Sequence, residues 1–337
     1  LLSEFGEDVA GAVQFVTPDR EEYAVTGGEV RWLSDTEFDQ RLSALQDDAA
    51  NTRLMDDPGR FSLAGAQSKM ALLEKNGHWG VPSGRIPTNR IVKLASGRYD
   101  GLLENEHFCI ELMNAVGLNT VRSRVINRRG ITAIVVDRYD RIQLEDGSLA
   151  RVHQEDMCQA NSVHPQSRYE NEGGPGVGNI LTTLNASRQP VDDREAFVRA
   201  QIVNFLLGGT DAHAKNFSIL LGEHGDIRLA PFYDVASLFP YHGHHRCRLA
   251  MRIGGSYDFD STLPRHWAAL GRRLGGKKAR PVQWLEEYAI KLPDCLPAVA
   301  DAVHASGVQH EIIGRLVDTI SESCERTLNQ ITHYRNS

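Results

Sequence analysis

Two aspartates and an asparagine between residues 209 and 238 have a spacing that could support phosphoryl transfer. Asp211 lies five residues before Asn216, and Asp234 follows eighteen residues after that asparagine. On the protein-kinase plan, one Asp accepts the proton of the acceptor hydroxyl, while an Asn and a second Asp hold magnesium. Magnesium takes oxygen ligands and keeps several waters, so one amide and one carboxylate suffice. The alternative is two unrelated surface turns, since Asp and Asn are common in turns.

The chain around these residues should hold the first aspartate rigidly. Residues 193–208 predict a helix that begins with an Asp cap and becomes apolar on every side from 202 to 207. A helix of that kind is buried all round, and Gly208 and Gly209 suit its C-terminus. We expect a hairpin between the asparagine and the second aspartate. Further upstream, the glycine-rich stretch 170–178 predicts a mobile loop.

A lysine and a glutamate upstream fit the same chemistry. Lys93 lies in the strand-like run NRIVKLA, from which it can reach the non-transferred phosphates of a nucleotide. Kinases hold this lysine with a helical glutamate, and Glu106 lies on the inward stripe of a helix predicted at 102–116. Glu104 and Glu111 are alternatives whose spacing points them more toward solvent. A lysine that blunts a sheet edge is the other interpretation of this strand.

The loop from Ser62 to Lys69 could lie against phosphates. Its small residues, Ala64, Gly65 and Ala66, would let backbone N–H groups approach phosphate oxygens. It lacks the repeated glycines of a GxGxxG loop, so a tight hairpin is the alternative.

Composition restricts the class of protein. The chain has 337 residues, of which 41% are hydrophobic and 24% charged, as in globular proteins. Its net charge of −7 gives no general basic field for nucleic acid. The five cysteines form no CxxC pair, which favours reduced thiols. Because no apolar run approaches bilayer length and no signal peptide opens the chain, we expect a soluble, cytoplasmic protein without membrane contact.

The order of elements predicts an α+β fold with the two lobes of a protein kinase. Strands, one helix and further strands occupy residues 1–140, which we assign to a strand-rich small lobe with the nucleotide loop and the phosphate lysine. Residues 141–337 would form a mostly helical large lobe with the catalytic loop and the metal-binding aspartate. The chain opens with Leu in an already patterned apolar stretch, which suggests a truncated or processed N-terminus.

With these segments in place, the chain resembles the HipA family of bacterial serine/threonine kinases, the toxins of HipA/HipB-type toxin–antitoxin modules. The similarity runs in the family's order from residue 1 to about 250. The segments that carry it are LLSEFGEDVAGAV, SLAGAQSKMALL, RIVKLA, ENEHFCIELMNAVGL, DRYDR, QEDMCQ, NEGGPG, NFLLGGTDAHAKNFS and LAPFYD. The family's usual N-terminal subdomain has no counterpart here, by truncation or by nature. Ala212 stands where some members have Gly, a mild change.

The resemblance implies roles for individual residues. Asp211 would be the catalytic base, with Asn216 and Asp234 as magnesium ligands. Lys93 would contact the phosphates, and Asp137 to Tyr139 would form the hinge that touches adenine. Ser62 matches the serine that family members autophosphorylate, which ejects its loop and switches the kinase off. The residues that we expect to bind ATP are Ala64, Gly65, Ala66, Gln67, Lys93, Asp137, Tyr139, His213 and Lys215. Of these, His213 could instead orient the catalytic loop by a hydrogen bond to the backbone.

The sequence therefore predicts an ATP- and magnesium-dependent serine/threonine protein kinase that acts as a growth-inhibiting toxin. By resemblance, a HipB-like helix-turn-helix antitoxin would regulate it, DNA would be contacted only through that antitoxin, and the substrate would be an aminoacyl-tRNA synthetase. One alternative is a small-molecule kinase, in which Glu155 and Asp156 would suit a cationic alcohol. Another is a non-catalytic pseudokinase or binding subunit, which the presence of the base, both metal ligands and the lysine disfavours.

Overall fold

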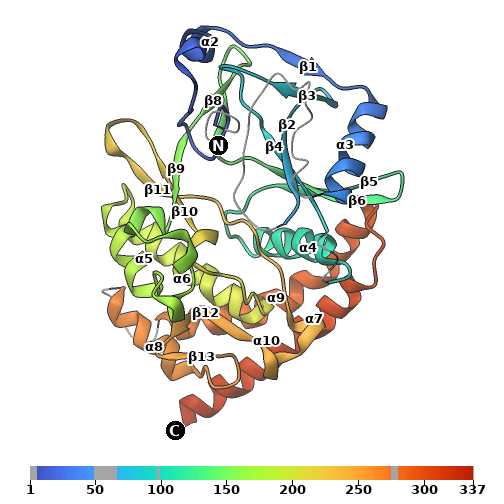
Figure 1. Ribbon diagram of the computed structural model, residues 1–337. Helices are drawn as coiled ribbons and strands as arrows, with labels where there is room; N and C mark the ends of the chain where they lie inside the picture. Colours follow the sequence, from blue (N-terminus) through green and yellow to red (C-terminus); the bar gives the residue numbers. More distant parts are fainter. Residues whose placement is uncertain (1–5, 49–66, 96, 98, 275–279, 337) are drawn as a thin grey trace. The chain divides into compact units, whose positions relative to one another are not determined.

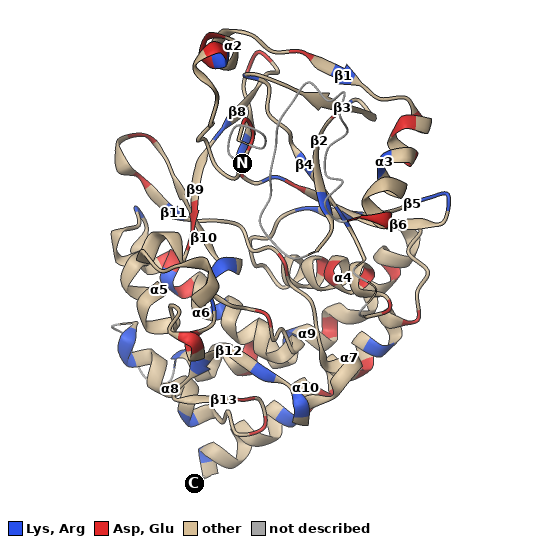
Figure 2. Cartoon of the chain, viewed as in Figure 1, with Lys and Arg blue, Asp and Glu red and all other residues tan. Residues whose placement is uncertain are grey.

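The computed structural model describes residues 6–48, 67–95, 97, 99–274 and 280–336 (Figure 1). The chain divides into two compact units, Leu1–Leu103 with Val121–Gln154, and Glu104–Thr120 with Glu155–Ser337. It therefore crosses between units after residues 103, 120 and 154, whereas we predicted one boundary at residue 140. The first unit contains most of the strands and the second most of the helices, which confirms the α+β class. Acidic and basic residues are interspersed along both units in Figure 2.

A six-stranded antiparallel sheet forms the centre of the first unit, in the order β1-β3-β2-β4-β6-β5. Its strands are β1 Val30–Trp32, β2 Lys69–Lys75, β3 His78–Pro82, β4 Arg90–Leu94, β5 Ser123–Arg128 and β6 Ile131–Asp137. The smaller elements of this unit are η1 Pro18–Arg20, α2 Glu21–Thr26, β7 Arg141–Gln143 and β8 Leu149–Arg151.

Helix α3 (Asp35–Asp47) supplies part of the core of the first unit. Phe38, Leu42 and Leu45 are spaced at helical periodicity and pack in one buried cluster with side chains of β2, β4 and β6. The helix begins after Ser34, whose hydroxyl accepts the Glu37 N–H while the glutamate side chain binds back to the Ser34 N–H. This capping box fixes the entry of the chain into the helix.

The second unit is mostly helical, with α-helices that range from 4 to 26 residues in length. These are α4 Leu102–Ala115, α5 Val177–Thr183, α6 Pro190–Leu207, α7 Phe239–His242, α8 Pro264–Arg273, α9 Arg280–Ala305 and α10 Ile312–Asn336. Its strands are β10 Ser218–Leu221, β11 Ile227–Leu229, β12 Arg248–Ile253 and β13 Ser256–Asp258, together with the end of β9 His153–Asp156, which begins in the first unit. The short 3-10 turns are η2 Gln159–Asn161, η3 Pro165–Ser167, η4 Glu170–Glu172, η5 Leu184–Ala186, η6 Ala214–Asn216, η7 Glu223–Gly225 and η8 His244–Arg246. No helix in the described ranges is both long enough and apolar enough to cross a membrane.

Helix α6 is the buried helix expected before the catalytic loop, although its start differs from the prediction. Every residue from Gln201 to Leu207 is buried. The helix begins at Pro190, and not at an aspartate cap, because the fixed φ of proline suits the first helical position. Asp193 lies inside the helix, buried, where its carboxylate accepts the Ser187 hydroxyl and the Leu229 N–H at 3.0 Å. That aspartate joins α6 to β11.

Candidate functional site

Two glycines allow the chain to turn sharply at the end of α6. Gly208 has a left-handed φ of +77°, and a Cβ added to it would lie 2.4 Å from the ring of Phe239. Its carbonyl accepts the Leu238 N–H at 3.0 Å. A Cβ on Gly209 would lie 2.4 Å from the side-chain oxygen of Asn204. The turn therefore needs glycine for both conformation and space, and it leads directly from a buried helix into the loop of Asp211.

The loop from Asp211 to Asn216 is closed by bonds to one carbonyl. The Asp211 carbonyl accepts the His213 N–H at 2.7 Å and the side-chain N–H of Asn216 at 2.8 Å. His213 and Asn216 are buried, whereas the Asp211 side chain is 63% exposed. The structure thus brings Asp211 and Asn216 together as the spacing predicts, with the carboxylate open to solvent and the amide held against the backbone.

Tyr169, a residue that the sequence analysis missed, contacts the predicted base directly. Its hydroxyl donates to Oδ1 of Asp211 at 2.5 Å. Its ring packs edge-on against His213, with centroids 4.9 Å apart. Burial, together with the hydrogen bond to Asp211, raises the pKa of Tyr169 to about 12, so the phenol is a neutral donor.

The buried His213 side chain lies beside the Asp211 carboxylate. Its Nε2 lies 3.8 Å from Oδ1 of Asp211. Burial lowers its pKa, and the negative charges of Asp211 and Asp234 oppose that shift only in part. Among the described groups, its Nδ1 has no hydrogen-bond partner. The bond that closes the loop comes from the backbone N–H of this residue. The backbone contact that we considered for its side chain stays a prediction.

Lys215 is held by Asp156 at the end of β9. The two side chains form an ion pair, and Oδ1 of Asp156 also accepts the N–H groups of Cys158 at 2.9 Å and Gln159 at 3.0 Å. The next residue, Met157, donates its N–H to the Phe217 carbonyl at 2.9 Å. Because Asp156 is already engaged in this way, the argument for a cationic alcohol substrate loses one of its two carboxylates.

Asp234 lies beyond the β10–β11 hairpin, where we expected the second metal ligand. It is exposed and has a left-handed φ of 58°, a conformation that Asp tolerates better than most residues. Its neighbour Tyr233 donates to the Lys215 carbonyl at 2.8 Å and lies 2.6 Å from the Ser218 hydroxyl. The negative charge of Asp234 is one of those that raise the pKa of His213, in the loop from Asp211 to Asn216.

The donor chemistry of these residues fits a magnesium ion. The side-chain N–H of Asn216 donates to the Asp211 carbonyl, which leaves the amide oxygen for another partner. Together with the Asp234 carboxylate, that oxygen is a hard ligand of the kind magnesium prefers. The described part of the chain contains no group of three His, Cys, Asp or Glu side chains placed to bind a metal. Asn216 and Asp234 would supply one amide oxygen and one carboxylate, so a magnesium site made by them does not require such a group of three.

Asn105 fixes the segment that follows Asp234. Its side-chain N–H donates to the Ser237 carbonyl at 2.8 Å, and its oxygen accepts the Ser237 N–H at 2.9 Å. The asparagine is fully buried. Glu106, the next residue of α4, is 4% exposed, while Glu104 and Glu111 are only partly buried. The predicted choice of glutamate agrees with this burial, and its pairing with Lys93 stays a prediction.

In the first unit, Lys93 occupies a central strand. β4 lies between β2 and β6, and Lys93 is opposite Lys69 on one side and Ile134 on the other. It is 8% exposed. The alternative of a lysine that blunts a sheet edge is therefore wrong.

The other predicted nucleotide-binding residues of this unit have local partners. Gln67 donates to the Leu94 carbonyl at 2.8 Å, Asp137 pairs with Arg90 at 3.2 Å, and Tyr139 donates to the side-chain oxygen of Gln154. The loop residues Ser62, Ala64, Gly65 and Ala66 lie outside the described residues.

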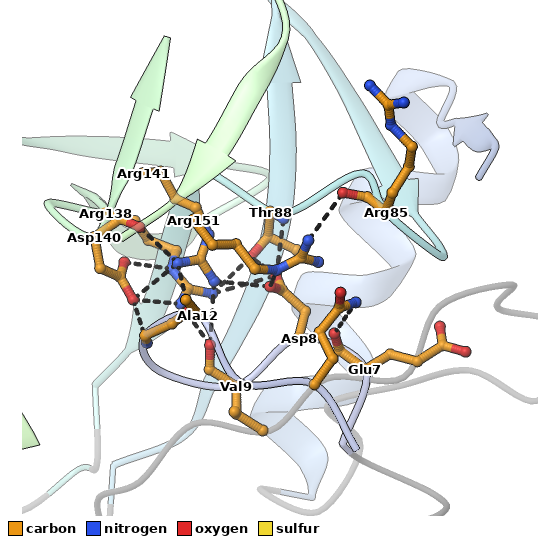
Figure 3. A network of polar contacts seen from close by, with 12 residues as sticks. Glu7, Asp8, Val9, Ala12, Arg85, Thr88, Arg138, Asp140, Arg141 and Arg151 are labelled. Carbon is orange, nitrogen blue, oxygen red and sulfur yellow. Dashed lines mark hydrogen bonds and ion pairs between the residues drawn. The ribbon is translucent and has the colours of Figure 1, made fainter. Parts of the chain in front are cut away.

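A buried ionic network contains Arg138, Asp140 and Arg141, which flank Tyr139 in the chain (Figure 3). Oδ1 of Asp8 accepts from Arg141 at 2.7 Å and Arg151 at 3.0 Å, and Oδ2 accepts the Thr88 hydroxyl at 2.6 Å. Arg138 donates to both oxygens of Asp140, at 3.0 and 2.8 Å, and to Oδ2 of Asp8 at 3.3 Å. Burial alone would raise the pKa of Asp8, but the three arginines and Thr88 lower it to about 2.

The network was not expected from the sequence. In the sequence, the network is indicated only by the charged residues in DRYDR and the acidic residues in SEFGED, two segments that carry the family resemblance. It attaches residues 8–11 to the chain on both sides of Tyr139. The N-terminal segment thus supports the predicted hinge.

Comparison with known proteins identifies the family. A model of the HipA-like C-terminal domain matches residues 61–296. The chain belongs to this HipA-like family. The match includes every predicted site residue from Ser62 to Asp234.

Relatives of this HipA-like chain carry kinase names. "Putative kinase Y4mE" of Sinorhizobium fredii is 38% identical over 82% of this chain and 66% of its own length. The serine/threonine-protein kinase toxin HipA of Shewanella oneidensis is 26% identical over 100% of this chain and 78% of its own length. These relatives support a kinase of HipA type.

Two solved structures support the fold. HipA in the Shewanella oneidensis complex of HipA, HipB and operator DNA has a TM-score of 0.82 and 24% identity, covering 98% of this chain and 79% of that chain. The Helicobacter pylori proinflammatory kinase CtkA has a TM-score of 0.53 and 12% identity, covering 79% of this chain and 93% of that chain. The HipA-like chain therefore has the predicted kinase-like fold.

Proposed function

We propose that this HipA-like chain is an ATP- and magnesium-dependent serine/threonine protein kinase in which Asp211 is the catalytic base. The observation that carries the proposal is the closed loop after α6. It presents one exposed carboxylate while its neighbours His213 and Asn216 are buried. A base that must reach the hydroxyl of a protein substrate needs this combination of rigid support and open access.

The remaining roles follow from the donor chemistry of each residue. Asn216 and Asp234 would hold magnesium, which when bound neutralises charge on the phosphates. Lys93 supplies a positive charge from a central strand, where the sheet holds its backbone on both sides. Ser62, with the loop that contains Ala64, Gly65 and Ala66, would cover the phosphates, and phosphorylation of that serine would place a dianion beside them.

We further propose that the kinase is a toxin controlled by a small helix-turn-helix antitoxin. Its likeness to HipA in a complex with HipB and operator DNA, and its relative named as a HipA toxin, support this proposal. The net charge of −7 makes the chain a poor autonomous DNA binder, so the antitoxin would read the operator. An aminoacyl-tRNA synthetase remains the proposed class of substrate.

The decisive experiment is phosphoryl transfer from labelled ATP by the wild-type protein and by Asp211→Asn. The variant should bind magnesium-ATP normally and transfer phosphate about 10²–10⁴-fold more slowly, because proton acceptance by the base is lost. Asp226→Asn is the matched control, since the Asp226 side chain is similarly exposed (50%) and forms a surface pair with Arg188. Transfer by Asp211→Asn at the rate of the control would contradict the proposal.

The acceptor is tested separately. The labelled reaction is run with the chain itself, with protein acceptors that include aminoacyl-tRNA synthetases, and with small alcohols. Phosphoserine found by mass spectrometry on a protein acceptor or on Ser62 supports a protein kinase. Label that appears only on the small alcohols would contradict that part of the proposal.

A further inference from the structure

We propose that Tyr169 is a positioning residue that holds the Asp211 carboxylate by one oxygen, so that the other oxygen faces the acceptor hydroxyl. This inference rests on the proposed role of Asp211 as the catalytic base. It adds a second residue to the acceptor site, from a segment 42 positions away in the sequence.

The geometry around the carboxylate distinguishes its two oxygens. Oδ1 accepts the Tyr169 hydroxyl at 2.5 Å and faces Nε2 of His213 at 3.8 Å. The carboxylate as a whole is nevertheless 63% exposed. An unrestrained aspartate would rotate about χ2, whose preference is broad and two-fold. A short bond to Oδ1 fixes that rotation and leaves Oδ2 as the oxygen that can accept a proton from a substrate.

The tyrosine is itself firmly held. The carbonyl of Arg168 accepts the Ala214 N–H from the catalytic loop at 3.3 Å, and the carbonyl of Tyr169 accepts the Gly174 N–H at 2.9 Å. A Cβ on Gly174 would lie 2.2 Å from the Ser167 carbonyl oxygen, so the chain folds tightly onto itself at this point. The bond to Ala214 attaches the segment around Tyr169 to the loop that contains Asp211.

A second anchor holds the same segment from the other side. Glu170 accepts the Arg252 backbone N–H at 2.5 Å and its side chain at 3.1 Å. The glutamate side chain is 15% exposed. The stretch 170–178, which we predicted to be a mobile loop, contains η4 and the start of α5 and is bonded to β12. A segment fastened in this way suits a permanent support rather than a removable cover.

The alternative use of this contact is inhibition. A phenol that donates to the catalytic base occupies the place where a substrate hydroxyl would donate. In that case removing the hydroxyl would speed the reaction, whereas a positioning role predicts that the reaction slows. The two roles therefore differ in the direction of the effect.

The test is Tyr169→Phe, which keeps the ring against His213 and deletes only the donor. We expect kcat for phosphoryl transfer from magnesium-ATP to fall about 10-fold while KM for ATP changes less than two-fold, since the substitution acts at the acceptor side. Tyr334→Phe, at a tyrosine of α10 that is 40% exposed, is the control and should match the wild type. A rate for Tyr169→Phe equal to or above that of the control overturns the inference.

A double-mutant cycle separates this inference from the proposed function. In an Asp211→Ala background, Tyr169→Phe should have no further effect on kcat, because its partner is gone. An equal loss in both backgrounds would mean that the tyrosine acts independently of Asp211, which overturns the positioning role. If Asp211→Ala alone is fully active, the proposed function fails; if only Tyr169→Phe is fully active, the base assignment stands and this inference fails.

Discussion

Asp8 in the first unit and Asp211 in the second are carboxylates in opposite settings. Asp8 is 4% exposed, and both of its oxygens accept bonds from arginines or Thr88. The Asp211 side chain is 63% exposed, with one oxygen held by Tyr169. A saturated buried charge contributes to folding, whereas an open charge on a rigid support is available for chemistry. The contrast predicts which property each substitution changes.

The largest effect should be on activity, at the open carboxylate. Asp211→Ala should lower kcat by about 10³-fold, close to 4 kcal/mol of transition-state free energy. Its thermal unfolding midpoint should stay within about 2 °C of the wild type, because an exposed carboxylate contributes little to stability. Parallel measurements of kcat and of the thermal unfolding midpoint test these two expectations. A large drop in the midpoint would place Asp211 with Asp8 as a structural residue.

The next effect should be on stability, at the saturated carboxylate. Asp8→Asn should lower the free energy of unfolding by roughly 3–5 kcal/mol, because it leaves the buried Arg138 and Arg141 and the partly buried Arg151 without the negative partner that all three share. Urea denaturation measures the loss. Asp226→Asn, at an exposed pair, is the control and should change it by less than about 0.5 kcal/mol. A difference between the two variants below about 1 kcal/mol would show that the network is not a stability element.

The third-largest effect should be a loss of stability at the glycine turn that precedes Asp211. Gly208→Ala adds left-handed strain and a contact with the Phe239 ring, and should cost roughly 2–3 kcal/mol. Gly225→Ala is the matched control, because Gly225 has a φ of +80° and open space around its Cβ position. Only the backbone strain of about 1 kcal/mol should appear there. Equal losses from chemical denaturation of the two variants would mean that the Phe239 contact adds nothing.

The smallest effect should be on the pH dependence of the free energy of unfolding. The pKa of Asp8 in the folded protein is about 2, below its ordinary value of 3.8, so its ionised form stabilises the fold above pH 4. That contribution disappears as the pH falls from about 4 through about 2. The difference in unfolding free energy between the wild type and Asp8→Asn should therefore shrink by about 2 kcal/mol over this range. Urea titrations at several pH values measure it, and a constant difference would contradict the lowered pKa.

The sequence predicted the local features of the candidate site well. The all-round apolar stretch of α6, its glycine end and the hairpin before Asp234 each follow from short-range pattern, and the structure has all three. Helix starts were less certain. Pro190 rather than Asp193 opens α6, because several residues near a helix start can serve as its cap and tertiary contacts select among them.

The contacts that sequence reasoning missed join distant segments. Tyr169 reaches Asp211 across 42 positions, Asn105 reaches Ser237 across 132, and Asp8 reaches Arg138 across 130. No periodicity records such pairs, because each depends on how whole elements pack. A partial signal existed for Tyr169 and Asn105, since each lies in or next to a segment that carries the family resemblance. Neither residue is an acid, base or metal ligand, so a search for reacting groups passes over them.

Helix α4 and the chain around Asp234 are bonded at two separated points. Near the start of the helix, the side-chain amide of Asn105 donates one hydrogen bond to the Ser237 backbone and accepts another from it. Beyond the end of the helix, the Asn119 carbonyl accepts the Phe232 N–H at 2.8 Å. Two such attachments leave little freedom for one segment to rotate without the other. A ligand that orders the Asp234 carboxylate should therefore also slow amide hydrogen exchange along α4, so exchange in this helix would report on binding at the proposed metal ligand.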